Sequence, residues 1–303
     1  PADPSARRLS FRHRDEYDRV HHYRVELDTG IPGASAPIVA ELAPSRTGVT
    51  MRFTLPGGGS VLFDRLGDGD VEIRPRPQPA RGAIVTGWVH QRADDGRVVP
   101  RMFVWGELDG DVTAVGRMSA PFRGDVGWAR IGATSAAPAI VELRVGVSFL
   151  SLDQARANLR ADIGDASFDE VAARAQEAWD DSLGAIEVEG ATREQRITLA
   201  SGLVRTLMFP NTAHEIVDGA PVYASPFAAS LGDTATQTGL RTGRGLLSTN
   251  NGYWDTYRTA WPLLGLIDPT TPALLDGTLQ HARDSGWMSR WSAPGPVDSM
   301  VGT

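Results

Sequence analysis

The chain has 303 residues, of which 41% are hydrophobic and 22% charged, as in an ordinary globular protein with an ample core. The formal net charge of −7 argues against a nucleic acid or an anionic membrane as partner, because binding to phosphates needs a basic surface. No cysteine is present, which excludes a disulfide framework, a thiolate metal site and a cysteine nucleophile.

The two ends of the chain have the character of interior segments. Pro1–Arg8 lacks the pattern of a signal peptide, and Ser299–Thr303 offers neither a capped helix nor a polar tail. No apolar run approaches the ~20 residues of a membrane span. We therefore expect a piece of a longer polypeptide, with about two domains as the prior for this length.

The first half of the chain has the two-residue period of β-strands. From about Tyr23 to Phe149, apolar and polar residues alternate over segments of five to nine residues, separated by glycine- and proline-rich stretches. The spacing of about ten residues, without helical pattern between segments, predicts an antiparallel β-sandwich. The expected strands are 23–27, 36–42, 48–55, 60–64, 70–74, 83–90, 101–108 and 139–149.

After residue 150 the period becomes helical. Three capping boxes, Ser151–Gln154, Ser167–Glu170 and Thr192–Gln195, predict three helix starts. The acids in these first turns are interpreted as partners of the helix dipoles and not as catalytic groups. Apolar stripes follow in the second and third helices, formed by Phe168, Val171, Ala175, Ala178 and Trp179 and by Ile197, Ala200, Val204, Leu207 and Met208.

Residues 211–252 show little periodicity and are rich in glycine, threonine and proline, which predicts a long functional loop. A helix is expected from Asp255 to Ile267, where Pro262 could divide it. Another is expected after Thr271 as its cap, ending before Gly286. Strands followed by helices indicate two domains or an α+β arrangement.

The segment 251–264 carries the strongest chemical signal. Between Tyr253 and Trp261 it gathers four aromatic rings with Asp255 and Arg258. Aromatic faces pack on the C–H face of a sugar, and a carboxylate accepts hydrogen bonds from its hydroxyls. The alternative is a helix entering the core, with Trp254 and Trp261 as filler seven residues apart. Both interpretations remain open from the pattern alone.

Other chemistry finds little support. His21–His22 and His214–Glu215 do not have the spacing of a metal-ligand motif. A P-loop is excluded because the chain has no lysine, and a G-x-S-x-G nucleophile motif is absent. The glycine-rich segment 239–245 follows no strand pattern, so we do not expect it to bind phosphate.

Several segments resemble glycoside hydrolase family 92, in order and over nearly the whole chain. The Trp-Asp-Thr-aromatic-Arg motif that follows a Pro-Asn helix end is the most specific. The matching segments are Phe11–Glu16, Tyr23–Leu27, Val147–Ser151, Ala155–Leu159, Leu207–Thr212, Asn251–Arg258, Gly286–Trp291 and Met300–Gly302.

The resemblance implies a calcium-dependent, inverting exo-α-mannosidase that acts mostly on α-1,2-mannosides of glycans. It implies a β-sandwich, a helical linker and an (α/α)6 barrel, here a partial sandwich at 1–150, the linker at 151–190 and the start of the barrel at 191–303. Trp254 and Asp255 would then lie in the −1 subsite, with Arg290 in the same pocket. A secreted, cell-surface or periplasmic bacterial protein is expected from such a substrate.

The chain departs from the family pattern at both ends. The opening of the sandwich has no counterpart before Pro1, and the general acid, the base and most calcium ligands are expected beyond Thr303. The pair of carboxyl groups that an inverting enzyme needs, about 6.5–9.5 Å apart, therefore cannot be named, and no metal ligand is assigned. The expected partners are a mannose-containing glycan and the remainder of the same polypeptide.

Three functions remain from the sequence. The first is the exo-α-mannosidase, and the second is hydrolysis of mannose-1-phosphodiesters within the same family, where a good leaving group makes the general acid dispensable. The third is a non-catalytic carbohydrate-binding module, which predicts sugar binding by residues 1–150 alone. The position of the 251–258 motif in the helical part argues against the third.

Overall fold

The computed structural model describes residues 5–29, 36–64, 68–77, 81–90, 99–120, 124–132, 137–227 and 230–297. It forms two compact units. The β-rich unit comprises Pro1–Gln91, Arg101–Glu177 and Ala235–Gln237, and the helical unit comprises Arg92–Pro100, Ala178–Thr234 and Thr238–Thr303. The finer division at residues 150 and 190 stays a prediction, and the 300–302 segment of the resemblance lies outside the described residues.

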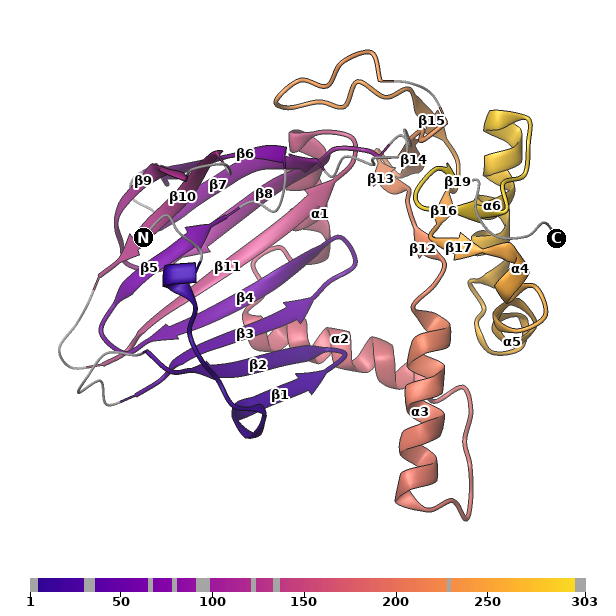
Figure 1. Ribbon diagram of the computed structural model, residues 1–303, viewed down its shortest axis with the longest axis horizontal. Coiled ribbons are helices and arrows are strands. Elements are labelled where there is room, and N and C mark those ends of the chain that lie inside the picture. The colour runs from indigo at the N-terminus through magenta and orange to yellow at the C-terminus, as the bar shows by residue number, and fades with distance from the viewer. Residues whose placement is uncertain are drawn as a thin grey trace. The chain divides into compact units, whose positions relative to one another are not determined.

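The β-rich unit contains two antiparallel sheets (Figure 1). The larger has eight strands in the order β1-β2-β3-β4-β11-β8-β7-β6, and the smaller has the order β5-β10-β9. The strands are β1 Glu16–Arg19, β2 His22–Leu27, β3 Ile38–Pro44, β4 Gly48–Leu55, β5 Gly59–Phe63, β6 Asp68–Pro75, β7 Ala83–His90, β8 Met102–Asp109, β9 Val112–Ala120, β10 Gly124–Ile131 and β11 Ala139–Ser148. Short 3-10 turns precede them at Ser5–Arg7 and His13–Asp15.

All eight predicted strands are present, and the sequence patterns missed β1, β9 and β10. In β10 the buried positions on one face are Gly127, Ala129 and Ile131, so small residues hide the apolar alternation. In β9, position 116 requires a glycine, because a side chain there would collide with the ring of Trp128. This glycine also weakens the apolar pattern of the strand.

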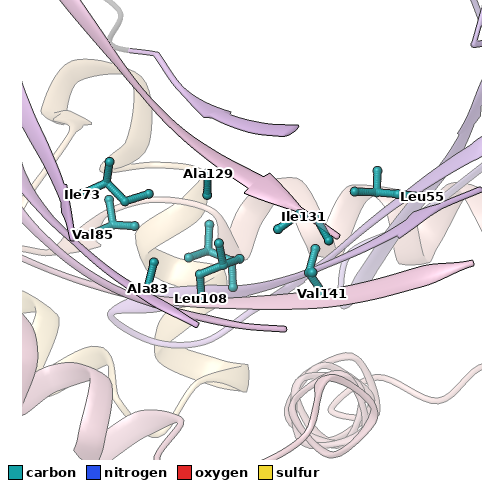
Figure 2. Packing of buried hydrophobic residues seen from close by; sticks show 9 residues of the cluster. Leu55, Ile73, Ala83, Val85, Leu108, Ala129, Ile131 and Val141 are labelled. Atoms are coloured by element: carbon teal, nitrogen blue, oxygen red, sulfur yellow. The ribbon is translucent and has the colours of Figure 1, made fainter. Parts of the chain in front are cut away.

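The main core lies between the two sheets. Leu108 of the large sheet is fully buried, and Ala129 and Ile131 of β10 pack into the same cluster (Figure 2). Partly buried residues of β5 and β9, among them Phe63 and Val115, close it from the small-sheet side. The removal of this apolar surface from water is the main stabilising contribution in this unit.

A second core lies between the large sheet and two helices. Helix α1 (Leu152–Asp162) packs on β11 and β8, and Phe168 and Val171 at the start of α2 (Phe168–Leu183) join the same cluster. Both helices begin as predicted: the Ser151 hydroxyl accepts from the Gln154 amide at 3.0 Å, and Ser167 and Glu170 bond reciprocally.

In its described residues, the helical unit contains helices and short paired strands. The helices are α3 Arg193–Leu207, α4 Tyr253–Thr256, α5 Ala260–Ile267 and α6 Thr271–Ser285. The strands are β12 Asn211–Thr212, β13 Glu215–Val217, β14 Ala220–Ala224, β15 Thr242–Arg244, β16 Ser248–Thr249, β17 Asn251–Gly252, β18 Trp291–Ser292 and β19 Pro296–Val297. No helix in the described ranges is long and apolar enough to cross a membrane.

Four local expectations need correction in this unit. Short strands pair at both ends of 211–252, and the irregular segment is confined to 225–241, whose described residues form no helix or strand. The helix expected over 255–267 breaks before Ala260, and Pro262 lies in the first turn of α5, where its missing N–H is tolerated. Thr271 is the first helical residue of α6 and not its cap.

The fourth correction concerns the apolar stripe of α3. The capping box Thr192–Gln195 forms as predicted, but Ile197 is 49% and Met208 48% exposed. The buried residue is Leu203, outside the expected stripe. Helix α3 therefore presents apolar side chains to solvent in this chain.

Candidate functional site

A short strand pair brings the 251–258 motif together with the aromatic segment near residue 290. In the ladder of β17 and β18, Gly252 pairs with Trp291, and the Tyr253 N–H donates to the Arg290 carbonyl at 3.2 Å. Two segments about forty residues apart in sequence thus lie side by side. Arg290 is partly buried there, next to the backbone of the motif.

The absence of a side chain at Gly252 makes room for the site. A Cβ on this residue would overlap the indole Nε1 of Trp291 and come within 2.6 Å of the Asp255 Oδ2. The indole N–H and the carboxylate therefore approach the same point of the backbone. One is a hydrogen-bond donor and the other an acceptor, which together can hold a hydroxyl group.

The Asp255 carboxylate is available to a ligand. Its side chain is exposed and has no hydrogen-bond or ion-pair partner in the part of the chain that the structure describes. Trp254 beside it is 43% exposed, so it is not core filler in this chain. Arg258 is engaged locally, since its guanidinium lies 4.6 Å from the centre of the Tyr257 ring and bonds the phenol oxygen.

Hydrogen bonds around Thr256 fix the turn that carries these groups. The Thr256 hydroxyl donates to the Gly252 carbonyl at 2.8 Å and lies 3.2 Å from the Asn251 side-chain oxygen. The Asn251 N–H donates to the Ser292 hydroxyl at 3.3 Å. Because both ends of the turn are tied to β17 and β18, Asp255 is held by backbone geometry.

Buried polar groups lie beneath the turn. The Asn251 Nδ2, the Tyr253 hydroxyl and the Ser289 hydroxyl are buried without a good hydrogen bond among the described residues. Burial raises the pKa of Tyr253, and the nearby Ser292 and Ser289 hydroxyls have a smaller, opposite effect. Buried polar groups of this kind usually acquire partners from water or a ligand.

Helix α6 is held against the hairpins by a second polar network. The Tyr223 hydroxyl donates to the Asp284 carboxylate at 2.8 Å, and Gln280 bonds both residues at 2.9 Å. Burial and the Asp284 carboxylate raise the pKa of Tyr223 to about 12. His281, fully buried on the same helix, lies 2.8 Å from the Ser248 carbonyl. These contacts hold α6 against β14 and β16.

The structure brings Asp255 and the Arg290 backbone together and leaves Trp254 exposed beside them. The sequence interpretation missed Trp291, whose indole lies against Gly252. The aromatic and basic segment 286–291 is visible in the sequence, but a two-residue strand pair that joins it to the motif has no sequence signature. The roles of Trp254, Asp255 and Arg290 in binding a sugar remain predictions.

Within the described ranges, no group of three or more histidine, aspartate and glutamate side chains is arranged to hold a metal ion. The described part of the site offers one carboxylate and one indole N–H, which are groups that can bond a hydroxyl, beside an exposed aromatic ring.

The C-terminal half matches a known enzyme family. A family model described as the glycosyl hydrolase family 92 catalytic domain matches residues 154–303. No curated protein matches the sequence.

Solved structures share the fold over most of the chain. The family GH92 inverting mannosidase BT2199 from Bacteroides thetaiotaomicron VPI-5482 has a TM-score of 0.82 at 24% identity, covering 97% of this chain and 39% of its own. The GH92 alpha-mannosidase BT3965 from the same species, in complex with mannoimidazole, has a TM-score of 0.70 at 17% identity, covering 93% and 37%. The GH92 glycosyl hydrolase ccman5 has a TM-score of 0.66 at 21% identity, covering 92% and 38%.

These matches show the fold of the chain, a mostly β-sheet N-terminal region followed by helices, as in the solved family GH92 structures. Residues 154–303 belong to the glycosyl hydrolase family 92 catalytic domain, of which the chain carries a part. It spans about two fifths of the length of the solved relatives.

Proposed function

We propose that this chain is part of an exo-acting α-mannosidase that removes terminal α-linked mannose, of the α-1,2 type, from glycans with inversion. The observation that carries the proposal is the exposed, unpaired Asp255 carboxylate at the Trp291 indole, within the segment that matches the family's catalytic domain. Asp255 would accept hydrogen bonds from mannose hydroxyls, and Trp254 would offer its ring to the sugar.

We further propose that residues beyond Thr303 supply the two carboxyl groups of the inverting reaction. The first protonates the leaving oxygen and the other activates a water on the opposite face of the sugar. Within this chain, Asp255, Trp291 and Arg290 would bind and orient the sugar ring. Such positioning lowers the barrier because it replaces a random encounter with a held geometry.

We also propose that the whole enzyme binds calcium, as the family resemblance implies. No cluster of three or more acidic and histidine side chains that could hold a metal ion is present in the described residues, so we assign the ion to the remainder of the polypeptide. Secretion to the cell surface or periplasm of a bacterium is inferred from the glycan substrate and would be tested by fractionation of the producing cells.

The proposal also includes the start of an (α/α)6 barrel in the helical unit. The exposed apolar stripe of α3 supports this, because Ile197 and Met208 would be covered by later barrel helices. The carbohydrate-binding-module hypothesis is not pursued, since the family match lies in a catalytic domain.

The test is release of mannose from α-1,2-mannobiose by the longer polypeptide that contains this chain, with calcium and with a chelator. We expect calcium-dependent release that falls by about 100-fold or more in Asp255→Ala, the scale seen when a held transition-state contact is lost. Glu187→Ala, an exposed carboxylate of the helical unit outside the site, is the matched control and should not change the rate.

Full activity in Asp255→Ala would show that the motif serves only the fold. Turnover of a mannose-1-phosphodiester without release from mannobiose would favour the phosphodiesterase instead.

A further inference from the structure

The helical unit contains a cavity of about 490 Å³ that is lined by none of the residues of the candidate site. The end of α2 contributes Trp179, Asp181 and Ser182, the end of α3 contributes Leu207, and the connection between α5 and α6 contributes Asp268 and Thr270. Its volume lies in the range of small-molecule sites, roughly 300–1,000 Å³.

Trp179 gives this cavity an aromatic wall. The sequence placed Trp179 on the apolar stripe of α2, but only Phe168 and Val171, at the start of that stripe, are buried in a core. Trp179 is half-buried and lines the cavity. Its indole N–H has no hydrogen-bond partner among the residues that the structure describes. A ring and one donor are thus available to a ligand.

The polar groups of the lining are mostly acceptors. The Asp181 carboxylate has no hydrogen-bond or ion-pair partner in the described chain. One oxygen of Asp268 accepts from the Thr270 N–H at 2.8 Å and its hydroxyl at 2.7 Å, which fixes the turn between α5 and α6. The Ser182 hydroxyl donates to the Ala178 carbonyl at 2.8 Å, so its lone pairs remain free to accept.

This lining selects the class of ligand. Two carboxylates and no basic residue disfavour a phosphate or a carboxylate ligand, because like charges repel. Two carboxylates fall short of a metal-binding group. A neutral sugar fits better, since its hydroxyls donate to carboxylates while its C–H face packs on an indole.

We propose that this cavity is an accessory site for one sugar residue of a glycan, stacked on Trp179 and hydrogen-bonded by Asp181 and Asp268. Hydrolysis is not required for this binding; only the choice of a mannoside as probe rests on the proposed function. The site would let the protein hold a second part of a branched or extended glycan.

The test follows the Trp179 indole N–H by NMR in the Asp255→Ala variant of the 303-residue chain, so that binding at the candidate site does not contribute, at a dilution where light scattering shows a monomer. Trp179→Phe assigns the resonance among the eight tryptophans. On titration with α-1,2-mannobiose, we expect a saturable shift of this resonance. Asp181→Asn should weaken the apparent affinity about tenfold, the loss expected for one charge-assisted hydrogen bond.

Glu177→Gln is the matched control: it removes a carboxylate one helical turn earlier on α2, outside the lining, and should leave the affinity unchanged. An unmoved Trp179 resonance would overturn the proposal, as would equal affinity in Asp181→Asn. A shift with choline but not with mannobiose would also overturn it and identify a cation site. Hydrolysis by the longer polypeptide is measured separately, so failure of one proposal does not imply failure of the other.

Discussion

The backbone at Gly252 lies between the Trp291 indole and the Asp255 carboxylate. We predict that Gly252→Ala destabilises the chain by about 1–3 kcal/mol, because the added methyl overlaps the indole and the strand pair must shift. Urea unfolding measures the change. Gly265→Ala is the control, since its Cβ would meet no atom within 4 Å. Equal stability of the two variants would contradict the crowded geometry.

His281 predicts a dependence of stability on pH. Burial lowers its pKa from 6.5, against the smaller opposing effects of the Ser248 carbonyl and Asp284. The unfolded chain then binds the proton more tightly than the folded chain. The contribution of His281 is therefore intact above pH 6.5 and is lost as pH falls from 6.5 through the folded-state pKa.

The measurement is the urea midpoint of the wild type and of His281→Gln at pH 7.5 and pH 5. We expect the wild type to lose more stability on acidification than the variant. An identical pH dependence in the two proteins would rule out His281 as the source.

At the residue scale, local chemistry could be predicted and long-range pairing could not. Ser151 and Thr192 cap helices as their capping boxes indicate, because both partners lie within four residues. Asp255 stands out by its aromatic neighbours. Trp291 could not be assigned to the site, because its contact with Gly252 depends on how distant segments pair.

At the scale of elements, α6 packs closely on β16 through a glycine. A Cβ on Gly277 would lie 2.5 Å from the Ser248 hydroxyl and 2.8 Å from its backbone nitrogen. We predict that Gly277→Ala costs about 1–3 kcal/mol through overpacking. Gly202→Ala in α3, where nothing lies within 4 Å, should instead stabilise by about 0.5–1 kcal/mol. Thermal melting of both variants checks the opposite signs.

The strands of the large sheet could be predicted because their faces differ strongly in polarity. Strand β11 has alternating burial along most of its length, as its sequence indicates. Strand β10 was not predicted, because two of its buried positions are occupied by Gly127 and Ala129, which contribute little to an apolar pattern. The predicted burial of the α3 stripe was wrong for another reason. An apolar helix face is buried only when the element that packs against it is present.

At the scale of the whole molecule, the order of a β-rich region and then helices follows from the change of period near residue 150. The spatial order of the large sheet does not, because β11 is inserted between β4 and β8. That order depends on which strands pair across long loops, and the alternation pattern of each strand is compatible with several neighbours.

The helical unit exposes apolar side chains on α5 and α6, with Leu266 85% and Leu279 51% exposed. If the proposed barrel covers these helices, the 303-residue chain alone should self-associate, because exposed apolar patches drive contact between copies. We predict that the double variant Leu266→Glu, Leu279→Glu shifts the chain toward the monomer in light scattering.

In the longer polypeptide, the same variant should lower stability by about 3 kcal/mol or more, because both charges would be buried without partners. The exposed pair Glu187→Gln, Glu189→Gln in the same unit serves as the control and should change neither result. Unchanged stability of the longer polypeptide would show that α5 and α6 face solvent there, and the proposed start of a barrel would then be wrong.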